Sequence, residues 1–165
     1  MYAGAHQELL IDIVKQDPED DVRIEAVKKL DPDKNQKLLV DIAELGVESH
    51  IFRIVAIEKL NADANQDLFL RIARKESVLD KYYDHIRNAA IKKLDVDKNE
   101  KLFLDIAKSN LANHLRIEAI KKLDVDKYSQ LLEEISTNDS ERDVARAAGR
   151  KILNRERGVP PNLNL

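Results

Sequence analysis

One stretch decides the fold, Asp21-Val-Arg-Ile-Glu-Ala-Val-Lys-Lys-Leu-Asp-Pro-Asp-Lys-Asn-Gln-Lys-Leu-Leu-Val-Asp-Ile-Ala43, because edited copies of it recur along the chain. Its first part returns at Phe52–Leu60, Ile86–Leu94 and Leu115–Leu123, and a weaker copy closes the series at Val144–Ile152. One alanine marks the register of each copy, at Ala26, Ala56, Ala90, Ala119 and Ala148, in steps of 30, 34, 29 and 29 residues. A fixed period of this size is typical of repeat arrays.

Composition favours thin layers of helices. Of the 165 residues, 36% are charged, yet the net charge is only -3, so both signs are interspersed. Aromatic residues make up 4%, and the chain has no Trp or Cys, which excludes disulfides and thiolate chemistry. The start lacks the pattern of a signal peptide, and no apolar run is long enough to span a membrane. We therefore expect a cytoplasmic protein.

Each repeat predicts two helices. In the first helix of the second repeat, Leu38, Leu39, Ile42 and Ala43 form one apolar stripe, and Val22, Ala26, Val27 and Leu30 form another in the second helix of the first repeat. Neither helix can bury its stripe alone, so neighbouring pairs must stack. We predict one domain over 1–154, with units at about 5–30, 34–60, 64–94, 98–123 and 127–154. The prolines of the last segment, 155–165, predict an extended or disordered tail.

The second helices resemble the HEAT repeat. The resemblance rests on four sets of residues, which are Val22, Arg23, Ala26 and Leu30; Phe52, Arg53, Ala56 and Leu60; Ile86, Arg87, Ala90 and Leu94; and Leu115, Arg116, Ala119 and Leu123. In the fifth unit Ala145 replaces the arginine, which indicates an atypical terminal repeat. The period is similar to that of the short HEAT-like variety, which also occurs in bilin lyases. The resemblance implies an all-α, right-handed superhelix (a HEAT-like solenoid) of five helical hairpins. It also implies a protein-binding scaffold whose second helices line the concave side.

An arginine recurs near the centre of the apolar arc of four second helices, as Arg23, Arg53, Arg87 and Arg116. A cation in that position must be paired. We expect each arginine to find an aspartate or a carbonyl of its own or the next unit, and so to form a structural ladder. Phosphate binding is the alternative.

Lysine recurs near the end of every second helix, as Lys29, Lys59, Lys93, Lys122 and Lys151. A second base precedes four of them, as Lys28, Lys92, Lys121 and Arg150, with Glu58 as the exception. We expect all of these side chains to be exposed and to form a basic binding surface for an acidic protein or peptide. The alternative is a solvated face with lysines placed favourably at helix C-termini.

The third repeat departs from the period, with extra residues within Lys75–Asp84. Its basic and aromatic residues form a second candidate binding patch of Arg71, Arg74, Lys75, Lys81, Tyr82 and Tyr83. Tyr and Arg are enriched at binding hot spots. The alternative is that one tyrosine packs beneath a longer loop.

Metal sites are not expected. Asp31-x-Asp33-x-Asn35 matches the first positions of a calcium-binding EF-hand loop, but Gln36 and Ile42 stand where Gly and Glu are needed. Helix capping between stacked pairs explains these residues. His85 and His114 lie one repeat apart, too far to ligate one metal.

Catalytic motifs are not found, so we predict a non-enzymatic protein that has no cofactor and acts as a protein-binding scaffold, as a monomer or weak homo-oligomer. The alternative is nucleic-acid binding through the phosphate backbone, although the pI near 5.9 weighs against it. A HEAT-like enzyme, such as a bilin lyase or a DNA glycosylase, is a third reading.

Overall fold

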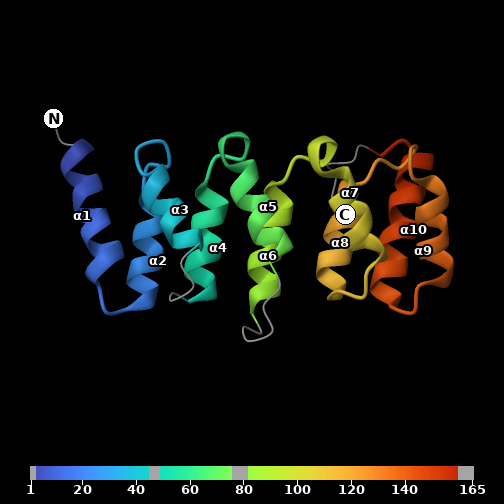
Figure 1. The fold of residues 1–165 in the computed structure, drawn as a ribbon, viewed down its shortest axis with the longest axis horizontal. Helices are drawn as coiled ribbons and strands as arrows, with labels where there is room; N and C mark the ends of the chain where they lie inside the picture. Colours follow the sequence, from blue (N-terminus) through green and yellow to red (C-terminus); the bar gives the residue numbers. More distant parts are fainter. Residues whose placement is uncertain (1–2, 45–48, 76–81, 160–165) are drawn as a thin grey trace. The chain divides into compact units, whose positions relative to one another are not determined.

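Helices account for the regular structure of this chain (Figure 1). The structure is a computed structural model, and it describes residues 3–44, 49–75 and 82–159. Within these ranges there are ten α-helices, one short 3-10 helix and no strand, which confirms the all-α prediction. The chain divides into two compact units, Met1–Leu94 and Asp95–Leu165, and each is described by itself.

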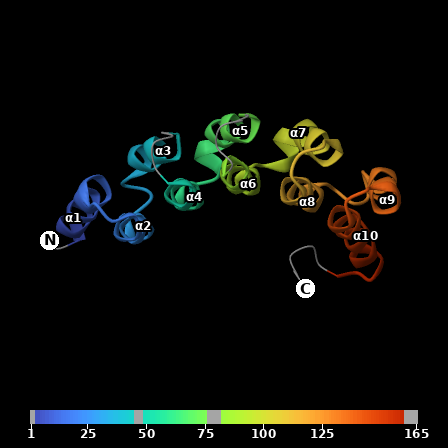
Figure 2. The same cartoon turned by 90° about the horizontal axis from the view of Figure 1, so that it is seen from below.

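The first unit consists of three helical hairpins. They are formed by α1 (Ala3–Gln16) and α2 (Asp20–Lys29), by α3 (Gln36–Glu44) and α4 (His50–Lys59), and by α5 (Gln66–Arg74) and α6 (Tyr83–Lys93), with the 3-10 turn η1 (Asp63–Asn65) before α5. Helices α1, α3 and α5 lie in one layer and α2, α4 and α6 in a second (Figure 2). The closest backbone contacts between successive hairpins join α2 to α4 and α4 to α6.

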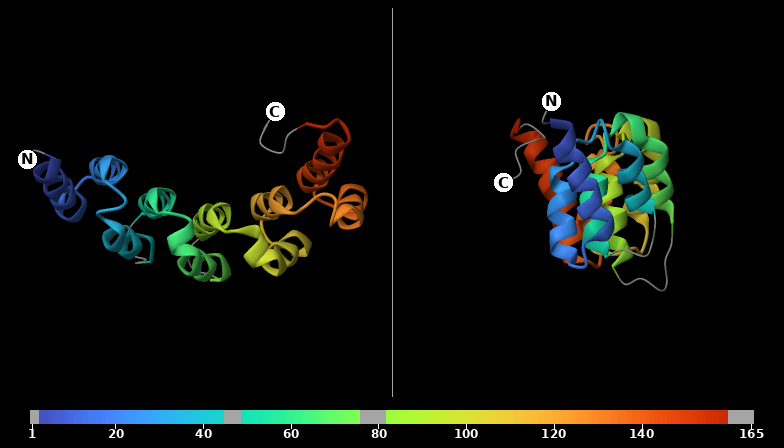
Figure 3. Two further views of the ribbon diagram at one scale, coloured as in Figure 1. Left: turned by 90° about the horizontal axis from the view of Figure 1, so that it is seen from above. Right: turned by 90° about the vertical axis from the view of Figure 1, so that its left-hand side faces the viewer.

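The second unit repeats this arrangement with two hairpins, drawn in yellow to red in Figure 3. Helix α7 (Val96–Lys108) packs on α8 (Asn113–Lys122), and α9 (Ser129–Asn138) packs on α10 (Arg142–Glu156). Helix α8 also contacts α10 directly, as second helices do in the first unit. A non-helical residue, Asn99, kinks α7 near its start.

The core follows the apolar stripes that the sequence predicts. The three phenylalanines Phe52, Phe69 and Phe103 are fully buried, and so is the leucine that ends most second helices, as Leu60 and Leu94 show. The alanines that mark the register are buried as well, at Ala26, Ala56, Ala90, Ala119 and Ala148. A small side chain at this position lets neighbouring helices approach closely.

Helix ends are set by local chemistry. Ser49 accepts a hydrogen bond from the Phe52 amide at the start of α4. Helix α10 runs to Glu156, so the predicted boundary at residue 155 was two residues too early. The helix stops at Gly158, whose φ of 65° favours glycine, and two backbone bonds from Gly158 and Val159 close the turn. The rest of the predicted tail, 160–165, lies outside the described residues.

The loop that resembles the start of a calcium site closes on itself. The side chain of Asp31 accepts a hydrogen bond from the Asp33 amide, and the Asn35 side chain donates to the Asp31 carbonyl. Asn35 also donates to the Gln7 side chain of the preceding hairpin. These contacts are those of a structural loop between stacked hairpins.

Across the described ranges, no helix is long and apolar enough to cross a membrane.

Candidate binding site

Two of the recurring lysines in the first unit bond to the preceding hairpin. The Lys59 Nζ donates to the Lys28 carbonyl at 2.8 Å, and the Lys93 Nζ donates to the Glu58 carbonyl at 2.6 Å. Both acceptors lie in the last turn of a second helix, where carbonyls lack partners within the helix. Both lysines are half-buried, so their expected exposure was wrong.

The second unit holds the same bond. The Lys151 Nζ donates to the Lys121 carbonyl at 2.6 Å. Burial lowers the pKa of Lys151, and Asp124 opposes this shift. Lys151 and Lys122 are also half-buried, contrary to expectation, whereas Lys29 in the first hairpin is exposed. The exposure was predicted from the periodicity of each helix alone, which does not show how close the end of the preceding second helix lies.

The base that precedes this position is exposed in four second helices, as Lys28, Lys92, Lys121 and Arg150. Two of these lysines pair along their own helix, Lys28 with Glu25 at 2.6 Å and Lys121 with Glu118 at 3.7 Å. Exposed pairs of this kind contribute at most about 1 kcal/mol, so a partner can replace them.

The recurring arginines lie near the start of the second helices. Arg53 and Arg87 are buried, and the Nε of each donates to the carbonyl of Ala43 or Ala73, at 3.1 Å in both cases. That carbonyl belongs to the last turn of the first helix in the same hairpin. Arg23 is less buried, and it donates to the Asp20 side chain. Backbone carbonyls and nearby aspartates are the partners that a buried arginine requires.

Arg116 has an additional carboxylate partner. Its Nε donates to the Ala107 carbonyl at 3.2 Å, and its two terminal nitrogens donate to the two oxygens of Asp139. Asp139 is the residue that ends α9 in the next hairpin. The hydrogen bonds from Arg116 lower the pKa of Asp139, so this carboxylate stays ionised below its usual range.

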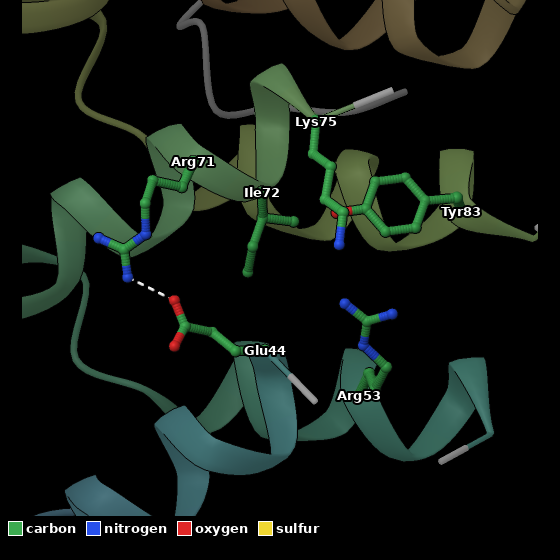
Figure 4. A pocket seen from close by; sticks show the side chains of 6 residues that line it. All are labelled: Glu44, Arg53, Arg71, Ile72, Lys75 and Tyr83. Carbon is green, nitrogen blue, oxygen red and sulfur yellow. Dashed lines mark hydrogen bonds and ion pairs between the residues drawn. The ribbon is translucent and has the colours of Figure 1, made fainter. Parts of the chain in front are cut away.

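An open pocket lies beside Arg53 in the first unit (Figure 4). It has a volume of about 190 Å³ and is lined by Glu44, Arg53, Arg71, Ile72, Lys75 and Tyr83. The Arg53 guanidinium carbon lies 5.5 Å from the centre of the Tyr83 ring, and the Lys75 Nζ lies 5.7 Å from it. Arg71 forms an ion pair with Glu44 at the other side of the pocket. Lys75 and Arg53 point into the space between them.

The pocket contains more positive than negative charge. Three cations, Arg53, Arg71 and Lys75, stand against the single carboxylate of Glu44. Lys75 is the residue that follows α5, as Asp139 follows α9, but it lies three residues after Ile72, whereas Asp139 lies four residues after the corresponding Ile135. Within the described ranges, no carboxylate forms an ion pair with Arg53.

The predicted patch in the third repeat therefore separates into different environments. Arg71, Lys75 and Tyr83 line the pocket, and Tyr83 is buried, as the packing alternative expected for one tyrosine. Tyr82 is 40% exposed. Arg74 is exposed and does not line the pocket. Lys81 lies outside the described residues.

Tyr82 forms a small aromatic cluster with His50 and His85. Its ring stacks on His50 at 4.2 Å between centroids, with an interplanar angle of 10°. His85 lies 6.4 Å from His50 in the same cluster. The exposed Ile51 adds an apolar side chain to the same helix start.

Two pocket residues, Glu44 and Ile72, are not predicted as site residues from the sequence. Glu44 and Ile72 lie in the last turns of different first helices, and no local pattern marks either of them.

Among the described residues, no group of three or more His, Asp or Glu side chains is arranged to hold a metal ion. Comparisons of the chain with protein-family models, with curated proteins and with solved structures find no match.

Proposed function

We propose that this chain is a HEAT-like solenoid of five helical hairpins and acts as a non-catalytic scaffold that binds an acidic segment of another protein. The pairing of helices supports the repeat architecture, because each hairpin packs internally and second helices contact one another within each unit. The tighter approach of the second helices favours their placement on the inner side of the array.

One observation carries the binding proposal. Four second helices present an exposed base at the same position, Lys28, Lys92, Lys121 and Arg150. The adjacent lysine is half-buried in α4, α6, α8 and α10, and in three of these helices its ammonium bonds to the preceding hairpin. The two kinds of base therefore serve different purposes, and the exposed series is the one available to an acidic partner.

A nucleic-acid partner is the alternative, and the same helices weigh against it. Glu25 and Glu118 lie beside the exposed lysines and pair with them, which places negative charge where a phosphate backbone would lie. The acidic side chains of a peptide can be spaced so that they avoid these glutamates, whereas a phosphate backbone carries a charge at every nucleotide.

The test is an affinity pull-down from a lysate of the source organism, with and without nuclease. The binding variant changes Lys28, Lys92, Lys121 and Arg150 to Glu. A matched control changes four exposed lysines of the first helices, Lys15, Lys37, Lys101 and Lys108, to Glu. The two variants have the same net charge, and circular dichroism checks that both remain helical.

We expect a protein that survives nuclease treatment and binds wild type and the control but not the binding variant. Retention only without nuclease would instead indicate nucleic acid, and the slope of log affinity against log salt would then count the phosphate contacts. If all three proteins retain the same partner, the exposed series is not the binding surface.

A further inference from the structure

We propose that the pocket formed by α3, α4, α5 and α6 is a receptor for one carboxylate side chain, Asp or Glu, of a protein partner. The inference adopts the acidic protein partner of the proposed function, but it concerns a different surface. Three steps support it: the arrangement of charge, the size of the pocket, and its place on the helices.

The charges of the pocket suit an arginine–carboxylate pair in which the partner protein supplies the carboxylate. In the second unit, the guanidinium of Arg116 bonds to both oxygens of Asp139. In the first unit, Arg53 is also buried and bonds to a first-helix carbonyl, but no carboxylate of the described residues forms an ion pair with it, and Lys75 points into the space beside it. A carboxylate between Arg53 and Lys75 would contact both cations and relieve their mutual repulsion.

The surroundings strengthen this attraction. Arg53 is only 4% exposed and Tyr83 is 3% exposed, so the inner wall of the pocket is poorly screened by water, whereas Lys75 is exposed at its opening. Arg71 already forms an ion pair with Glu44, so the cations that would attract a ligand carboxylate are Arg53 and Lys75. Arginine is the side chain best suited to bind a carboxylate in a planar geometry.

The size of the pocket favours a single side chain. Pockets for drug-sized ligands and cofactors occupy about 300–1,000 Å³. At about 190 Å³, this pocket is smaller, and it is open on one side. A carboxylate projecting from a protein chain fits this shape, because the rest of the partner can remain outside.

The pocket is separate from the exposed bases of the second helices. Arg53 lies in the first turn of α4, and Lys59 lies at its last residue. A helix of 10 residues is about 15 Å long. Within the first unit, the pocket and the C-terminal bases therefore lie at opposite ends of the same layer, and either one can bind without the other.

The test follows the arginine Nε–Hε signals by nuclear magnetic resonance while a short peptide is added. The probe is Ac-Ala-Glu-Ala-NH2, and Ac-Ala-Gln-Ala-NH2 is its uncharged control. We expect the glutamate peptide to move the Arg53 signal, with a dissociation constant on the order of millimolar for one carboxylate. The Arg116 signal should stay in place because Asp139 already occupies that guanidinium.

Two variants test the pocket in opposite directions. Lys75→Asp supplies the carboxylate from the chain itself, and we expect it to weaken the affinity at least about tenfold. Glu44→Gln removes the single acid of the pocket and should strengthen the affinity by a few-fold. Lys37→Asp is the matched control on an exposed site of α3, and it should leave the affinity unchanged.

Several results would overturn the proposal. They are an unmoved Arg53 signal, an equal response to the glutamine peptide, or an equal loss in Lys75→Asp and Lys37→Asp. Tighter binding of inorganic phosphate than of the glutamate peptide would reject a carboxylate ligand. A gain in affinity on replacing Glu76 and Asp80 by Gln and Asn would also overturn it, because the chain's own acids would then be the ligands of the pocket.

The outcome is independent of the pull-down. The variant with Lys28, Lys92, Lys121 and Arg150 changed to Glu keeps every pocket residue, so its Arg53 signal should respond to the peptide as in wild type. If it does while the pull-down finds no partner, the pocket stands and the proposed second-helix surface fails. If the pull-down succeeds and Arg53 does not respond, the reverse holds.

Discussion

Arg53 and Arg116 occupy the same position of the repeat but differ in their surroundings. Both are buried, and both donate to a carbonyl at the end of the first helix of their hairpin. In the second unit Asp139 completes the partners of the arginine, whereas in the first unit Lys75, which follows α5, lines the pocket beside Arg53. The recurring arginine thus bonds to a carboxylate in one unit and lines a pocket in the other.

The largest expected effect comes from breaking the closed site. Asp139→Ala leaves the buried Arg116 without its acid, and we expect the free energy of unfolding to fall by about 3 kcal/mol. Urea denaturation followed by circular dichroism measures the change. The double variant Arg116→Met, Asp139→Leu removes both charges and should recover most of the loss. A loss below about 0.5 kcal/mol in Asp139→Ala would mean that the pair does not support the fold.

Removing each arginine should separate the two sites. Arg116→Met leaves the half-buried Asp139 carboxylate without its cation, whereas Arg53 forms an ion pair with no acid of the described residues. We expect Arg116→Met to cost about 2 kcal/mol more than Arg53→Met in the free energy of unfolding. Equal losses would show that both arginines stabilise the chain mainly through their carbonyl bonds.

Converting the open site into the closed one is expected to have a smaller effect. Lys75→Asp places an acid in the pocket that Arg53 lines. We expect a gain of about 1 kcal/mol, because a charge-assisted hydrogen bond outweighs the unfavourable position of an acid at a helix C-terminus. Thermal and urea unfolding measure the gain, with Lys37→Asp as the control. A destabilised variant would mean that the acid cannot reach Arg53.

These predictions also show what the sequence can and cannot provide. Apolar periodicity, as around Leu39 and Ile42, predicts the helices. It also predicts that an arginine on the apolar face of a helix must have a partner. Helical periodicity wrongly predicted that Lys59 and Lys93 are exposed, because the carbonyl that accepts from each lysine lies on another helix, 31 and 35 residues earlier. The pocket was hidden for the same reason: its residues come from four helices, and their approach depends on packing.

The smallest effect concerns pH. The Asp139 pKa is lowered in the folded chain, so this carboxylate stabilises the fold above its unfolded pKa of about 3.9. That contribution is lost as the pH falls through the lowered folded value. The difference in unfolding free energy between wild type and Asp139→Asn should therefore shrink below about pH 4. A difference that stays constant from neutral to acid pH would exclude this linkage.

The lysine bond between hairpins has a consequence for how such a chain can grow. A segment such as Asp31–Leu60 contains both a donor, the ammonium of Lys59, and an acceptor, the carbonyl of Glu58. Tandem duplication of the segment gives each copied lysine the carbonyl of the copy before it, so whole repeats can be gained without new contacts.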